Sequence, residues 1–121
     1  MNRVVFYILF TLFSFCVSAK NMPRAIVLEH HGGGHNEYFD PADKPEVYYD
    51  DDNQEIILVA DGFVSSYDVD IVSLSTLQVV LFTAVNGYGD TIDVSTLPND
   101  NYKIVISTPY NNIYEGYFTN Y

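Results

Sequence analysis

Short runs of β-branched and aromatic residues, each followed by a turn-forming segment, dominate the sequence after Pro45. The runs cover residues 47–50, 55–60, 67–73, 78–85, 90–94, 102–108 and 113–118. No stretch keeps apolar residues at the 3.6-residue spacing of an amphipathic helix, and short runs of this composition are typical of β-strands. The pattern therefore predicts an all-β domain of about seven antiparallel strands, arranged as a sandwich or a barrel.

Residues that favour tight turns separate the runs. Asn86-Gly87 lies between two apolar runs, which is a strong signal for a β-hairpin because both residues tolerate positive φ. Asn111-Asn112 suggests a second hairpin between the last two strands. The sequence therefore predicts that each of these turns joins two strands that pair with one another.

The alternation of residue types assigns side chains to the two faces of a strand. Tyr102, Ile104 and Ile106 share one face, which we expect to point into the core. In the run 78–85 both faces are largely apolar, and this pattern is typical of a strand that is covered on both sides. We therefore expect residues 78–85 to form a central strand.

The first 19 residues have the three parts of a signal peptide. Arg3 gives a positive start, residues 4–17 form an apolar stretch, and residues 17–19 offer a small-residue cleavage site. The apolar stretch is shorter than the roughly 20 residues that a membrane-spanning helix needs. We expect a secreted or periplasmic protein with no stable membrane insertion after cleavage; a retained anchor, or lipidation of Cys16, is the alternative.

Cleavage after Ala19 leaves about 100 residues, which is enough for one small domain. Residues 20–45 are expected to form a short edge strand at 24–29 and a flexible loop, because three consecutive glycines at 32–34 lose much backbone freedom on ordering. Residues 46–121 are expected to form the main body. The one cysteine, Cys16, lies in the signal peptide, so the mature chain has no disulfide and no thiolate metal site.

The balance of charge narrows the possible partners. Five Lys and Arg residues stand against 16 Asp and Glu residues, for a formal net charge of −11 at pH 7. Such a surface repels phosphate groups, which disfavours binding to nucleic acid and to anionic lipid. Proteins, neutral sugars and cations remain as possible partners.

Residues 92–106 have the pattern of a strand, a loop that carries Leu97, and a strand opened by Tyr102. In sandwiches of immunoglobulin type, a Tyr at this corner packs inward and its hydroxyl donates to the upstream backbone. Together with the signal peptide, the cysteine-free mature chain and residues 114–118, this pattern resembles the small secreted immunoglobulin-like domains of the DUF3244 family of gut Bacteroidetes. The resemblance covers residues 24–118, and it implies an immunoglobulin-like antiparallel β-sandwich and no established activity.

Two segments carry residues suited to metal ions. His31 and His35, in a loop that also holds carboxylates, could bind zinc, copper or nickel, although the neighbouring glycines favour a solvated loop. Asp50 and Asp52 belong to a cluster of hard oxygen ligands of the kind that calcium prefers. That cluster lacks the glycine and terminal Glu of an EF-hand, and a charged turn is the alternative explanation.

The sequence gives little support to catalysis. It contains no Gly-x-Ser-x-Gly motif, and all three histidines lie in the N-terminal loop region, away from the predicted strands of the main body. Asp68 and Asp70 point to the same face of a strand, as a glycosidase pair would, but solvated carboxylates explain them equally well. We therefore expect no enzymatic activity and no cofactor.

Tyrosine is abundant, and so small a core cannot bury every copy of it. Tyr88 and Tyr110 lie in predicted turns, where an exposed ring offers contact area and a hydrogen bond at low entropic cost. The sequence therefore predicts a non-catalytic module that binds a protein or a glycan through these two residues. The alternatives are a structural or assembly component that pairs through the edge strand at 24–29, and a weak calcium-binding domain.

Overall fold

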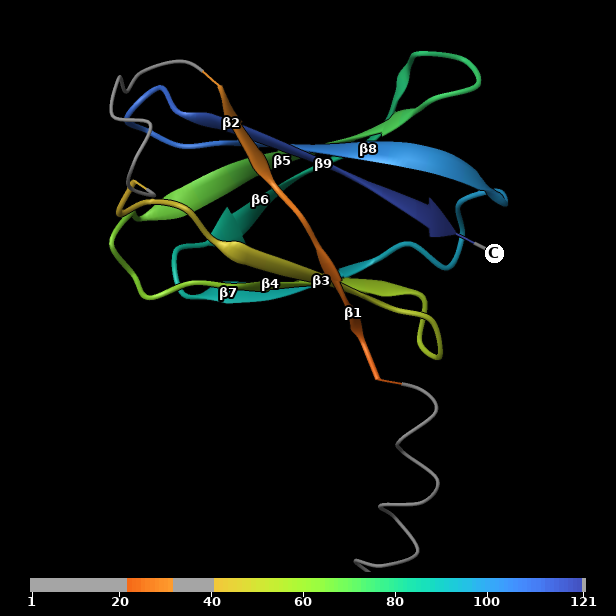
Figure 1. Cartoon of the computed structure of the whole chain (residues 1–121), viewed down its shortest axis with the longest axis horizontal. Helices are drawn as coiled ribbons and strands as arrows, with labels where there is room; N and C mark the ends of the chain where they lie inside the picture. Colours follow the sequence, from red (N-terminus) through yellow and green to blue (C-terminus); the bar gives the residue numbers. More distant parts are fainter. Residues whose placement is uncertain (1–21, 32–40, 121) are drawn as a thin grey trace, which may run out of the picture.

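The computed structural model describes residues 22–31 and 41–120, which form two antiparallel β-sheets packed face to face (Figure 1). The strands are β1 (Arg24–Ile26), β2 (Glu29–His31), β3 (Glu46–Asp50), β4 (Glu55–Val59), β5 (Ser66–Ser73), β6 (Val79–Asn86), β7 (Gly89–Asp93), β8 (Asp100–Ser107) and β9 (Ile113–Asn120). The seven predicted runs are all strands, with ends that differ from the prediction by no more than two residues. The fold is the expected all-β sandwich.

One sheet has the strand order β1-β3-β4-β7 and the other has the order β2-β9-β8-β5-β6. The core fills the space between them and includes the fully buried side chains of Ile56, Leu58, Ile71, Ile104 and Ile106. Tyr102, Ile104 and Ile106 point inward as predicted. The Tyr102 hydroxyl donates to the Pro98 carbonyl oxygen at 2.6 Å, so the tyrosine corner is present.

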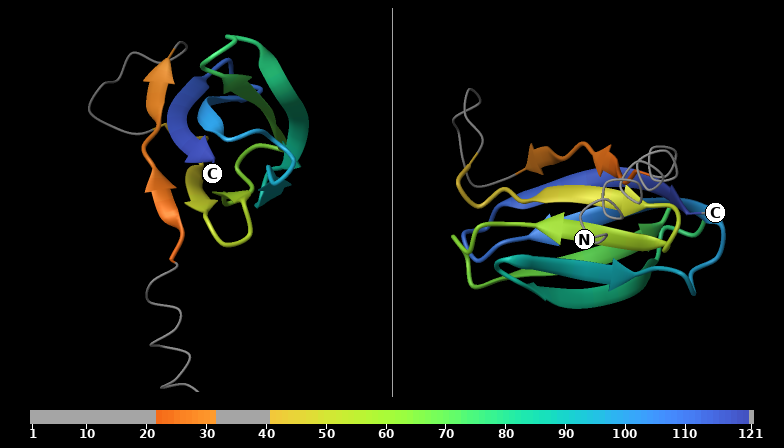
Figure 2. Two further views of the ribbon diagram at one scale, coloured as in Figure 1. Left: turned by 90° about the vertical axis from the view of Figure 1, so that its right-hand side faces the viewer. Right: turned by 90° about the horizontal axis from the view of Figure 1, so that it is seen from below.

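The N-terminal segment differs from the single strand expected at 24–29. It forms two short strands, β1 paired with β3 in one sheet and β2 paired with β9 in the other, so it crosses from sheet to sheet along one side of the sandwich (Figure 2). Gly116 of β9 allows this close approach, because a Cβ atom there would lie 2.5 Å from the Ile26 side chain and 3.0 Å from the Val27 carbonyl oxygen. The segment therefore closes this side of the sandwich.

The prediction of a central strand at 78–85 is wrong. β6 is the last strand of the five-stranded sheet and pairs only with β5 among the described strands. Val79, Val80 and Phe82 are 54%, 40% and 65% exposed. A strand with apolar residues on both faces is expected to be covered, but nothing among the described residues covers the outer face or the free edge of β6.

The predicted hairpin at Asn86-Gly87 is also corrected, because β6 and β7 belong to different sheets and this turn carries the chain between them. Gly87 is required there, since a Cβ atom would lie 1.8 Å from the Val64 carbonyl oxygen. The second predicted hairpin is confirmed: β8 pairs with β9, and Asn111 in the turn has a φ of 67°.

Candidate functional site

Three connections come together at one end of the sandwich: residues 60–65 between β4 and β5, the turn between β6 and β7, and residues 108–112 between β8 and β9 (Figure 1). Loops that a rigid sheet scaffold holds at one end of a sandwich are a common place for recognition residues. Each of these three connections carries one exposed aromatic side chain, namely Phe63, Tyr88 or Tyr110. We call these three residues the aromatic end.

Backbone hydrogen bonds fix the loop at 60–65 against the turn that carries Tyr88. The Gly62 amide donates to the Gly87 carbonyl oxygen at 3.0 Å, and the Gly87 amide donates to the Ser65 carbonyl oxygen at 3.0 Å. The Tyr88 ring lies directly over Gly62, where a Cβ atom would be 2.5 Å from two of its ring carbons. Gly62 has a φ of +85°, so glycine satisfies both the backbone and the packing at this position.

Phe63 connects the two tyrosine-bearing loops. Its ring centroid lies 5.6 Å from that of Tyr110, with an interplanar angle of 40°. The Asp61 carboxylate accepts a hydrogen bond from the Phe63 amide at 3.0 Å, which stabilises the turn at residues 61–63. Phe63, Tyr110 and Tyr88 are 52%, 58% and 72% exposed, so their rings remain accessible to a ligand.

The structure therefore places the two predicted tyrosines at the same end and adds Phe63 to them. Sequence reasoning missed Phe63. The sequence does contain an indication that Phe63 is exposed: it directly follows the turn-forming pair Asp61-Gly62, so it lies outside the strands and is not assigned to a core-facing position.

A buried carboxylate supports the loop that carries Tyr110. Asp43 is 1% exposed. Its Oδ2 accepts hydrogen bonds from Thr108 Oγ1 at 2.6 Å and Asn112 Nδ2 at 2.8 Å, and its Oδ1 accepts one from the Tyr114 hydroxyl at 2.5 Å. Thr108 Oγ1 accepts in turn from the Tyr110 amide at 3.2 Å. Asp43 thus fixes the start and the end of the β8–β9 hairpin, and with them the backbone under Tyr110.

Two effects of opposite sign act on the pKa of Asp43. Burial raises this pKa, but the hydrogen bonds from Thr108, Tyr114 and Asn112 together outweigh burial and hold the pKa below its ordinary value. The carboxylate is therefore ionised at neutral pH, although it is buried. His30 extends the network, because its Nε2 donates to Asn112 Oδ1 at 2.8 Å and its ring lies 5.2 Å from that of Tyr114.

Buried tyrosines account for much of the aromatic content that suggested a recognition surface. Tyr67, Tyr102 and Tyr114 are almost completely buried, and each hydroxyl has a hydrogen-bond acceptor. Burial raises the pKa of Tyr67, as does the nearby charge of Asp43. These rings belong to the core, whereas Tyr88 and Tyr110 at the aromatic end remain exposed.

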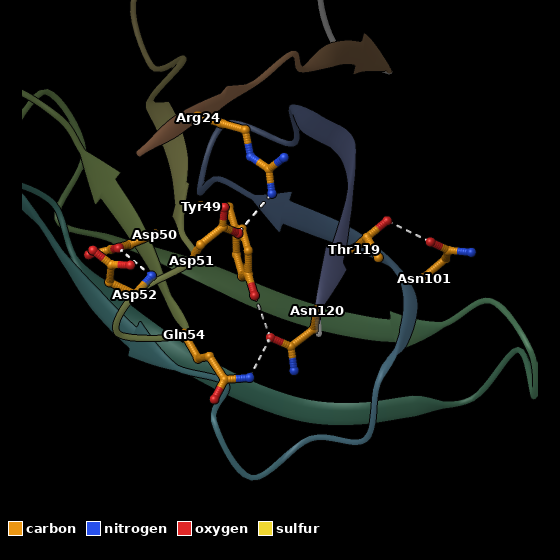
Figure 3. A network of polar contacts seen from close by, with 9 residues as sticks. All are labelled: Arg24, Tyr49, Asp50, Asp51, Asp52, Gln54, Asn101, Thr119 and Asn120. Carbon is orange, nitrogen blue, oxygen red and sulfur yellow. Dashed lines mark hydrogen bonds and ion pairs between the residues drawn. The ribbon is translucent and has the colours of Figure 1, made fainter. Parts of the chain in front are cut away.

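Of the predicted calcium ligands, Asp50 is the last residue of β3 and Asp52 lies in the turn that follows it (Figure 3). Asp50 accepts hydrogen bonds from the Asp52 amide at 3.0 Å and from Asn53 Nδ2 at 2.9 Å. Asp51 forms an ion pair with Arg24 at 2.8 Å. In this arrangement the Asp50 oxygens stabilise the turn, and Asp51 attaches β1 to it.

The predicted imidazole ligands do not form a cluster in the described part of the chain. His31 Nε2 lies 3.4 Å from a carboxylate oxygen of Glu115 and 3.9 Å from one of Glu29, and His35 lies outside the described residues. Across residues 22–31 and 41–120, no group of three or more His, Cys, Asp and Glu side chains is placed to hold a metal ion. The metal sites remain predictions.

A second buried polar group joins β9 to the rest of the fold (Figure 3). Asn120 accepts a hydrogen bond from the Tyr49 hydroxyl at 2.6 Å, and its Nδ2 donates to the Val94 and Leu97 carbonyl oxygens at 3.1 and 3.2 Å. Its side chain is completely buried. These contacts are structural, because they leave no polar atom of Asn120 facing a ligand.

Comparison with known proteins gives a fold and no activity. The structure is similar to that of a DUF3244 family protein with an immunoglobulin-like β-sandwich fold from Bacteroides vulgatus, with a TM-score of 0.65 and 18% sequence identity, over 83% of this chain and 100% of that one. No family model matches the sequence, and no curated protein matches it. In the described residues no helix is long and apolar enough to span a membrane. The expected resemblance is therefore confirmed at the level of fold: the chain is an immunoglobulin-like β-sandwich of the kind seen in that DUF3244 protein.

Proposed function

We propose that this protein is a secreted, non-catalytic binding module that recognises a protein or a glycan through the aromatic end. The observation that carries the proposal is the convergence of Phe63, Tyr88 and Tyr110, which come from three separate connections and are all more than half exposed. Contact between aromatic rings and water is unfavourable. Exposed aromatic side chains held on a rigid frame are therefore typical of a ligand-binding surface.

The support beneath the rings strengthens this proposal. Loops that bind ligands with little entropic cost are ordered before binding. The hydrogen bonds from Gly62 and Gly87 fix the frame of Tyr88, and the Asp43–Thr108 contact fixes that of Tyr110. The rings are thus displayed from a backbone that is already ordered.

The chemistry of the surface defines the ligand class. An exposed tyrosine offers a flat apolar face, which suits the C–H face of a sugar ring or an apolar side chain, and a hydroxyl for one hydrogen bond. The formal charge of −11 disfavours anionic ligands. A neutral glycan or a protein surface without excess negative charge fits both conditions.

The test compares variants of exposed tyrosines at different places. Glycan arrays, and pull-downs from the native envelope and medium, are run with the protein purified as exported and with Tyr88→Ala and Tyr110→Ala. Tyr117→Ala is the matched control, because Tyr117 is 57% exposed but lies on β9. Binding that both aromatic-end variants lose and the control keeps supports the proposal; equal loss in all three variants, or no binding by the parent, contradicts it.

A further inference from the structure

The two sheets together have four edge strands, and three of them carry the usual protection against pairing with another chain. β1 and β2 are three residues long and contain Arg24 and Glu29, respectively. β7 is five residues long and contains Asp90 and Asp93. Short length and charged side chains are the standard means by which a sheet edge avoids pairing with other strands.

β6 is the exception. It is eight residues long, from Val79 to Asn86, and contains no charged residue, no proline and no glycine. Val80 and Phe82 are exposed on it, and Leu77 in the preceding turn is 76% exposed. A long, uncharged and apolar edge is a template for an added strand, because its outward backbone groups have no partner in the sheet.

A groove runs along this edge. It has a volume of about 370 Å³ and lies between β6 and β7, where it is lined by Leu81, Thr83 and Val85 from one sheet and by Asp90 and Ile92 from the other. Asp93 also borders it. We call β6, β7 and this groove the open side of the sandwich, in contrast with the side that the N-terminal segment closes.

The charges around the open side define the occupant. Asp90 and Asp93 border the groove, and Asp70 lies opposite Phe82 on the neighbouring strand β5. No Lys or Arg residue is among the residues that line the groove. A second copy of this chain would add its own formal charge of −11, which opposes self-pairing, whereas a basic segment is attracted.

We propose that the open side binds an extended segment of a partner protein by strand addition to β6, and that this segment alternates basic and apolar residues. In an added strand successive side chains point to opposite faces. One set therefore enters the groove toward Asp90, which shares the inward face of β7 with Ile92, and the other lies on the outer face beside Phe82. Basic residues fit the first set and apolar residues fit the second. This surface adjoins the aromatic end at Tyr88, in the turn between β6 and β7, and does not include Phe63 or Tyr110.

The probe is an eight-residue peptide of alternating Lys and Val, blocked at both ends and added to the protein purified as exported. Two control peptides accompany it: one with Glu in place of Lys, and one with every backbone nitrogen methylated, which keeps the charge but removes the N–H donors. Binding is followed by amide chemical shifts and by hydrogen exchange of β6. We expect saturable binding of the Lys peptide alone, with new protection of β6 amides.

Protein variants test the position of the site. Phe82→Lys puts a charge on the edge, and Val27→Lys is its control, because Val27 is 81% exposed on the closed side. Asp90→Asn removes a charge at the groove, and Glu29→Gln removes one from β2, at the opposite edge of the sheet that contains β6. We expect Phe82→Lys and Asp90→Asn to weaken peptide binding about fivefold or more, and both controls to change it less than about twofold.

Three outcomes would overturn the proposal. Equal binding of the methylated peptide would show charge attraction without strand pairing. Equal weakening by a variant and its control would place the peptide elsewhere. Concentration-dependent self-association that protects β6 amides, with no peptide binding, would make this edge a contact between copies. Tyr110→Ala should leave peptide binding unchanged, because Tyr110 lies in the β8–β9 connection, so this variant distinguishes the test of the open side from that of the aromatic end.

Discussion

The closed side and the open side of the sandwich differ in whether a segment of chain covers the gap between the two sheets. On the closed side, the N-terminal segment pairs with β3 in one sheet and with β9 in the other, so one stretch of chain covers the gap between the sheets. On the open side, β6 and β7 end their sheets next to a groove. The buried Asp43 network, with His30 and Tyr114, belongs to the closed side.

The difference indicates where stability and recognition reside in this molecule. Asp43 and Tyr114 on the closed side are buried and hydrogen-bonded to residues far apart in the sequence, so substitutions there should lower the free energy of unfolding. The outward side chains of β6, such as Val80 and Phe82, are exposed, so substitutions there should alter binding while stability stays the same. The following predictions test this contrast, from the largest expected effect to the smallest.

Asp43→Ala should have the largest effect. It leaves the donors of Thr108, Asn112 and Tyr114 without their acceptor in a buried site, and each such group costs about 1–3 kcal/mol. We expect a total loss of about 3–5 kcal/mol of unfolding free energy, measured by urea denaturation. Asp43→Asn, which keeps one acceptor oxygen, should lose less. A loss below about 1 kcal/mol for the Ala variant would show that the network does not hold the closed side together.

The pH dependence of stability provides a second test at the same residue. The folded-state pKa of Asp43 is lowered, so the carboxylate contributes stability that is present above the unfolded-state pKa. That contribution is lost as the pH falls through the folded-state pKa. Denaturation curves between about pH 6 and pH 2 should therefore converge for the parent and Asp43→Asn at the acid end. A constant difference across this range would contradict the assignment.

Gly116→Val should loosen the N-terminal segment. The added side chain meets Ile26, Leu28 and the Val27 carbonyl oxygen, all within 3.1 Å of the new Cβ position. Crowding of this kind costs about 1–3 kcal/mol. Hydrogen exchange should accelerate in β1 and β2 before it does in β5 or β8. Uniform acceleration in all strands would show that the segment does not detach as a unit.

Tyr102→Phe should have a smaller effect, because it removes one hydroxyl and keeps the ring. The ring still stacks on Phe118 at a centroid distance of 5.5 Å, while the hydrogen bond to the Pro98 carbonyl oxygen is lost. We expect a loss of about 1 kcal/mol, or about 4–8 °C in Tm for a domain of this size. The exposed Tyr88→Phe variant is the control and should leave Tm unchanged.

Phe82→Thr should have the smallest effect on stability. Phe82 is 65% exposed on β6, and Thr has a high preference for strands. We expect a change within about 0.5 kcal/mol in thermal or urea unfolding, together with weaker binding of the Lys and Val peptide. A loss above about 1.5 kcal/mol would mean that Phe82 packs as a core residue and that the open side is closed by other parts of the chain.

Features that depend on residues close together in the sequence were predictable from the sequence alone. Strand positions follow from short β-branched runs, because alternation with period two is a property of each strand by itself. Tyr102 was identifiable because the tyrosine corner depends on a hydrogen bond to a carbonyl only four residues upstream. Tyr88 and Tyr110 were expected in turns, and turn residues are exposed by the geometry of the chain.

Other features depend on how distant segments meet, and only the tertiary structure decided them. Alternation cannot distinguish a covered strand from an apolar edge, so β6 was misplaced, and the turn at Asn86-Gly87 does not reveal whether the chain stays in one sheet. Asp43 finds its donors 65 to 71 residues along the chain. The convergence of Phe63, Tyr88 and Tyr110 has the same origin: the sequence determined the character of each residue, and the packing of two sheets determined which residues became neighbours.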